Sequence, residues 1–115
     1  MIIYNVTCKI EESLEEEWIK WMREVHVPEV CAKGGFIGAT LLRLKFPLED
    51  EGVTYAVQYR CISMQILDRY LSEHAPALQL DHTLKFGTDV IAFRTILEVE
   101  GEYAPISDFG GRISD

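Results

Sequence analysis

The feature that most constrains this fold is the order in which two hydrophobic periods alternate along the chain. Residues 2–10, IIYNVTCKI, and residues 53–61, VTYAVQYRC, place apolar side chains at every second position, as strands with one buried face do. Residues 14–25 and 67–78 repeat apolar side chains at helical spacing instead. With strands expected at 36–46 and 88–100, the order is strand, helix, strand, strand, helix, strand.

This order predicts an α+β fold of the ferredoxin-like βαββαβ kind, a four-stranded antiparallel sheet with both helices on one face. Capping residues and helix breakers set the expected boundaries. Ser13 and Glu16 have the spacing of a capping box at the start of the first helix. Ser63 is the expected N-cap of the second helix, which Pro76 should kink or restart near residue 75.

The length of the chain, 115 residues, is that of one domain. We expect residues 1–100 to form this domain and residues 101–115, which lack periodicity, to form a loosely ordered tail. The three cysteines, Cys8, Cys31 and Cys61, lie far apart with no C-x-x-C motif. Cys8 and Cys61 fall on the alternating pattern of strands, so we expect buried and inert thiols there.

The charge of the chain bears on its partners and location. The net charge is −8, and lysine and arginine do not cluster, so nucleic acid and anionic membranes are not expected partners. Neither a signal peptide nor an apolar stretch long enough to cross a bilayer is evident. These observations predict a cytoplasmic protein.

The strands indicate what covers the second face of the sheet. In the last strand, Ile91, Phe93 and Leu97 alternate with Val90 and Ile96, so both faces carry large apolar side chains. A sheet of this kind is usually covered on both sides. Because two helices cover only one side, we expect a homodimer formed through the sheet face.

Several motifs together resemble a known family. They are W-x-x-W-M-x-E-V-H-x-P-E-V, GVTYAVQY, APALQ-x-D-H and FG-x-x-x-x-AFRT-x-LE-V. They resemble a family of short bacterial domains of unknown function, over about residues 1–100. That family is similar to the dimeric α+β barrel superfamily, which includes cofactor-independent quinol monooxygenases, haem-using relatives, isomerases and ligand-sensing regulators. The resemblance implies the fold and the dimer, but it implies no particular reaction.

The segment WMREVHVPEV, residues 21–30, allows two interpretations. His26 near a helix end, followed by Pro28, is the ordinary composition of a helix terminus. Alternatively, His26 and Glu29 converge on a cavity between helix and sheet, where the carboxylate would tune an imidazole for proton abstraction.

The other two histidines are weaker candidates for a functional site. His74 lies on the apolar stripe of the second helix, where a histidine is more often a core residue than a catalyst. His82, next to Asp81, is expected on an exposed turn. No H-x-x-x-H or H-x-H spacing occurs, so we expect no metal. Neither a phosphate loop nor a dinucleotide fingerprint is present, and we expect no cofactor.

Polar residues on the strands form a further constellation. Asn5, Gln58, Arg60 and Arg94 would bind a small anionic or carbonyl ligand if they faced the same side. The alternative is a polar, partly wet dimer interface.

Two functions therefore stay open after the sequence is read. The first is a ligand-binding or structural module. The second is a cofactor-independent monooxygenase or isomerase acting on a small aromatic or carbonyl compound, with His26 or His74 as base and Asn5, Gln58 or Arg94 orienting an oxyanion. A haem-binding relative would need an open face opposite one of these histidines.

Overall fold

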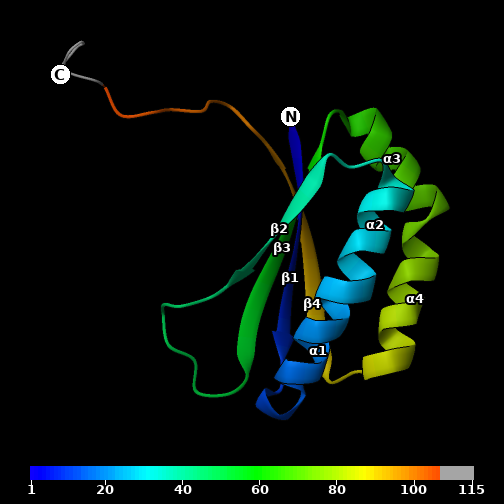
Figure 1. Ribbon diagram of the computed structural model, residues 1–115, viewed down its shortest axis with the longest axis vertical. Helices are drawn as coiled ribbons and strands as arrows, with labels where there is room; N and C mark the ends of the chain where they lie inside the picture. The colour runs from blue at the N-terminus through cyan, green and yellow to red at the C-terminus, as the bar shows by residue number, and fades with distance from the viewer. Residues whose placement is uncertain (107–115) are drawn as a thin grey trace.

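The computed structural model describes residues 1–106 of the chain. Its elements in chain order are β1 (Ile2–Ile10), η1 (Glu12–Leu14), α1 (Glu15–Trp21), η2 (Met22–His26), α2 (Val27–Gly34), β2 (Gly38–Arg43), β3 (Val53–Cys61), α3 (Met64–Glu73), α4 (Ala75–Phe86) and β4 (Val90–Glu98). The four strands form one antiparallel sheet in the order β2-β3-β1-β4. All the helices cover one face of this sheet (Figure 1). The ferredoxin-like fold predicted from the sequence is thus confirmed.

The strand register decides which side chains share a face. On β1, Tyr4 lies opposite Tyr59 of β3 and Ile96 of β4. Asn5, the next residue, lies opposite Gln58 and Thr95 and points to the other face. Even positions of β1 and β4 and odd positions of β3 therefore face the helices.

The core lies between the helices and this face of the sheet. Trp18 of α1, Val57 of β3 and Leu67 of α3 are at most 1% exposed. Cys8 and Cys61 are buried free thiols, as expected from the strand pattern. Burial of these apolar side chains is the dominant stabilising term of such a domain.

The first helix does not stop at His26. After α1 the backbone widens into the π-helical turn η2, in which the Val27 N–H donates to the Met22 carbonyl. The helix then continues without a break as α2, which ends at Gly34. Pro28 explains the turn, because a proline has no N–H and its ring crowds the carbonyl four residues earlier. The residue after the helix, Gly35, caps it with a φ of 65°, the left-handed conformation that glycine favours.

The other boundaries divide into confirmed and wrong predictions. Ser63 is the N-cap of α3 and its hydroxyl accepts from the Ile66 N–H at 3.3 Å, and the helix restarts at Ala75, beside Pro76. The capping box at Ser13 is wrong, since the chain there forms a short 3-10 turn with no side-chain cap. The 3-10 turn closes through its own backbone bonds, which leaves the serine hydroxyl unused.

The face of the sheet away from the helices is bare. Ile91, Phe93 and Leu97 of β4 are 66%, 60% and 47% exposed there. The loop between β2 and β3 and the segment after β4 extend on this side in Figure 1. Residues 101–106 have neither helix nor strand, and the remainder of the expected tail lies outside the described residues. Within residues 1–106 no helix has the length and apolar character to span a bilayer.

Candidate functional site

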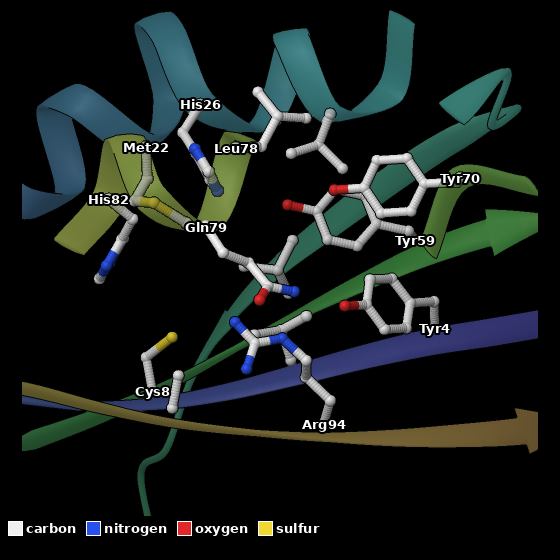
Figure 2. A pocket seen from close by; sticks show the side chains of 14 residues that line it. Tyr4, Cys8, Met22, His26, Tyr59, Tyr70, Leu78, Gln79, His82 and Arg94 are labelled. Carbon is white, nitrogen blue, oxygen red and sulfur yellow. The ribbon is translucent and has the colours of Figure 1, made fainter. Parts of the chain in front are cut away.

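A pocket lies between the helices and the sheet, at the level of the π-helical turn. We call it the interlayer pocket. Its volume is about 40 Å³, which is room for a few water-sized groups, since one such group needs roughly 10–15 Å³. Much of its wall is the apolar core, but eight polar side chains interrupt that wall (Figure 2).

The sheet supplies four of these polar side chains. Tyr4 and Cys8 come from β1, Tyr59 from β3 and Arg94 from β4. Arg94 lies opposite Val6 of β1, so strand alternation directs it to the helical side. As Figure 2 shows, its guanidinium reaches from the sheet into the centre of the pocket.

The helices supply the other four. His26 comes from the π-helical turn, Tyr70 from α3, and Gln79 and His82 from α4. Gln79 and His82 lie three positions apart and therefore on the same face of α4. In Figure 2 the side chains of His26 and Gln79 face the guanidinium from the side of the helices.

His26 has an unusual environment for an imidazole. Its ring stacks on Trp21 with centroids 4.8 Å apart, and its Nδ1 is buried with no hydrogen-bond partner among the described residues. The pKa of His26 is lowered from 6.5 to about 4, chiefly by burial and to a smaller extent by the nearby His82 and Arg94, while Asp81 opposes the shift. The imidazole is therefore neutral at physiological pH.

His82 corrects the prediction of an exposed turn, because it lies within α4 and is partly buried. The Trp18 indole N–H donates to His82 Nε2 at 3.0 Å, so the neutral ring carries its proton on Nδ1. Burial and the charge of Arg94 lower the pKa of His82. The sequence did contain a signal, since Leu78, His82 and Phe86 form one stripe at helical spacing.

The hydroxyls and the thiol in the pocket are also neutral. Burial raises the pKa of Tyr4, Tyr59 and Tyr70, and it raises the pKa of Cys8 to about 11. The charge of Arg94 opposes burial at Tyr4, Tyr70 and Cys8 without overcoming it. These side chains are therefore hydrogen-bonding groups and not nucleophiles at neutral pH.

Two of the residues proposed from the sequence lie outside the pocket. His74 joins α3 to α4, and its ring packs 6.5 Å from Tyr70. Glu29 sits on α2, one turn after His26, but its carboxylate does not line the pocket. The structure therefore brings His26 to the cavity without the glutamate that was expected to accompany it.

The strand constellation is divided between the two faces of the sheet. Asn5, Gln58 and Arg60 occupy positions on the bare face, whereas Arg94 faces the helices. Asn5 donates to Thr95 Oγ1 at 3.3 Å, and its buried Oδ1 has no partner within residues 1–106. The proposed shared binding site of these four residues is wrong, because the register of β4 places Arg94 opposite Val6 and not opposite Asn5.

The potential for metal binding is limited in the part of the chain that the structure describes. No group of three histidine, cysteine, aspartate or glutamate side chains gathers closely enough there to hold a metal ion. The pocket instead has apolar walls and a few convergent polar groups, a composition typical of sites for small organic ligands.

The fold and the pocket define this protein as a ferredoxin-like α+β domain with an interlayer cavity. It belongs to the family described as a domain of unknown function (DUF4286), whose model matches residues 1–100. None of the curated proteins matches the chain by sequence. The family assignment confirms the resemblance seen in the sequence.

Solved structures with the same fold include bacterial proteins of the antibiotic biosynthesis monooxygenase kind. A putative antibiotic biosynthesis monooxygenase from Deinococcus radiodurans aligns with a TM-score of 0.65 at 11% identity, covering 92% of this chain and 98% of that one. A second, from Bacillus cereus, gives 0.63 at 16% identity, covering 90% and 97%. SnoaB, a cofactor-independent oxygenase from Streptomyces nogalater, gives 0.59 at 14% identity, covering 88% and 95%. At these identities the likeness is one of fold.

Proposed function

We propose that this protein is a homodimeric module that binds a small organic ligand in the interlayer pocket. The observation that supports this most is the cavity itself, in which the side chains of His26, Gln79 and Arg94 converge between apolar walls. A few polar groups that converge in a mainly apolar cavity are typical of a site that orients a small organic ligand.

The three histidines allow a direct test of ligand binding. His26 and His82 line the pocket, whereas His74 lies outside it and serves as an internal control. A panel of small phenols, quinols, carboxylic acids and amides would be titrated into the protein while the imidazole Hε1 signals are followed by NMR. We expect at least one compound to shift the His26 and His82 signals saturably and to leave that of His74 in place. A panel in which every compound leaves all three signals unchanged would contradict ligand binding.

The dimer is proposed to form through the bare face of the sheet, with a second copy of the chain as its occupant. Exposed apolar side chains on β4 support this, as does the loop carrying Phe46 and Leu48, which extends on the same side and is more than 80% exposed at both. One structural neighbour, at a TM-score of 0.54 and 15% identity, is described as a dimeric ferredoxin-like protein.

Light scattering coupled to size exclusion would test the dimer. We expect a mass near twice the chain mass of 13.2 kDa. Phe93→Asp should give monomers, because it places a charge in the centre of the apolar face. Leu84→Asp is the matched control, since Leu84 is 75% exposed on α4, on the side of the helices. Monomeric wild type, or a dimer broken equally by both variants, would refute this interface.

Two further parts of the proposal rest on the sequence alone. We place the protein in the cytoplasm, and we do not expect nucleic acid as a partner, because the net charge is −8. Fractionation of cells and binding assays with a DNA duplex at low salt would test these two points.

The second candidate function is a cofactor-independent monooxygenase, and one observation favours it. His26 is a neutral imidazole inside the pocket, so it is available to take a proton from an acidic phenol or quinol, whose anion could then react with oxygen. A conjugate acid with a pKa of about 4 makes a weak base, however, and general bases work best with a pKa near the operating pH. We therefore rank binding above catalysis. Oxygen consumption with small quinols, compared between wild type and His26→Phe, would reverse this ranking if only the wild type exceeded the spontaneous rate.

A further inference from the structure

We propose that the interlayer pocket selects a ligand with a single compact negative charge, a carboxylate, held against the guanidinium of Arg94. This inference rests on the proposed function and names the ligand class of the same pocket. Three properties of the pocket support it: the geometry of its donors, its charge and its size.

The donors converge on one place. In Figure 2 the guanidinium of Arg94 and the amide of Gln79 lie together in the middle of the pocket, and the hydroxyl of Tyr4 points toward them. The hydroxyls of Tyr59 and Tyr70 enter the same pocket nearer the helices. A guanidinium offers a planar fork of N–H donors that matches the two oxygens of a carboxylate. Tyrosine hydroxyls and an amide NH₂ can donate to the same oxygens.

The charge of the pocket has one sign. No aspartate or glutamate is among its lining residues, and Arg94 makes no salt bridge within residues 1–106. Burial keeps the tyrosines, the thiol and the two imidazoles uncharged, as described above. Arg94 therefore contributes one uncompensated positive charge to a partly enclosed site in a chain whose net charge is −8. Asp81 and Glu29 are close enough to influence the pKa of pocket side chains, but neither lines the pocket beside Arg94.

The size of the pocket fits a small head group. A volume of about 40 Å³ corresponds to roughly three water-sized groups, which is the scale of a carboxylate and the carbon that bears it. Arg94 as a whole residue is exposed on the edge strand β4. We expect the body of a larger acid to extend past Arg94 toward this edge.

Pairs of acids and amides with nearly the same shape would test the charge. Acetate and acetamide, then benzoate and benzamide, would be titrated at pH 7.5 and constant ionic strength while the three imidazole Hε1 signals are followed. We expect the carboxylates to shift the His26 and His82 signals saturably and the amides to bind at least tenfold more weakly. Arg94→Met should remove this preference, and Arg94→Lys should keep it with weaker binding. Arg69→Met is the matched control, because Arg69 is an exposed arginine of α3 outside the pocket.

The outcomes separate this inference from the proposed function. Equal binding of benzoate and benzamide at the two pocket histidines would overturn the carboxylate preference and leave ligand binding intact. Carboxylate binding that survives Arg94→Met, in a variant whose thermal unfolding matches wild type, would overturn the role of Arg94. If neither acid shifts the pocket signals, the carboxylate inference fails, and the wider panel alone decides whether the pocket binds any ligand.

Discussion

Acidification is expected to destabilise the folded protein through the histidine that the π-helical turn places in the pocket. The pKa of His26 is about 4 in the folded state and near 6.5 in the unfolded chain, so the unfolded state binds the extra proton between these values. The contribution of the neutral His26 to the free energy of unfolding is therefore fully present above pH 6.5 and is lost as the pH falls toward 4. From these two pKa values, the loss on going from pH 7.5 to 5 is about 2 kcal/mol, an upper value because the ring is partly exposed.

The variant His26→Phe isolates this contribution. Phenylalanine keeps the stacking on Trp21, removes the titrating nitrogen atoms and leaves no unpartnered Nδ1. Urea unfolding followed by tryptophan fluorescence, at pH 7.5 and pH 5 and at one protein concentration, gives the free energy of unfolding in each case. We expect the variant to lose about 1–2 kcal/mol less than wild type on acidification. An identical loss in wild type and His26→Phe would refute the burial of a neutral imidazole.

Three further substitutions are predicted from single contacts. Ser63→Ala removes the cap of α3 and should lower the free energy of unfolding by about 1 kcal/mol in urea titrations, which an unchanged midpoint would contradict. Gly34→Ala would bring a methyl group to 2.6 Å from the buried Phe36 ring, so we expect a loss of roughly 1–3 kcal/mol; a variant as stable as wild type would show that the ring moves freely. Arg94→Met should raise the pKa of His82, because the guanidinium charge opposes protonation of the ring, and a fall in that pKa in an NMR titration would contradict the placement of the charge.

The fold could be read from the sequence because hydrophobic period and element order are local properties. β1 and β3 have the bounds predicted from alternation, whereas β2 and β4 are shorter than predicted at both ends. At β4 the first two predicted residues, 88 and 89, belong to the turn that follows α4. The sequence left open whether the helix ends at Pro28 or continues to the glycines at 34 and 35, because a π-helical turn has no sequence signature of its own.

The site was harder to predict because it depends on which elements meet. Arg94 was identified as a binding residue, but it was grouped with residues that lie on the other face of the sheet. Which positions of two strands share a face can be decided only when the register between the strands is known. His26 was identified together with Glu29, which lies elsewhere. His82 and Gln79 were not identified as pocket residues, because the sequence does not show that their face of α4 meets side chains of β1 and β4 in the pocket.

The alternation of β4 links the two halves of the proposal. Phe93 points to the bare face and Arg94 to the pocket, and β4 is an edge strand that pairs only with β1. A second copy on the bare face would therefore hold the strand that carries the pocket cation. The monomeric variant Phe93→Asp should accordingly bind benzoate several-fold more weakly than Leu84→Asp, although neither substitution touches the pocket. Equal affinities in the two variants would mean that pairing with β1 alone fixes the position of Arg94.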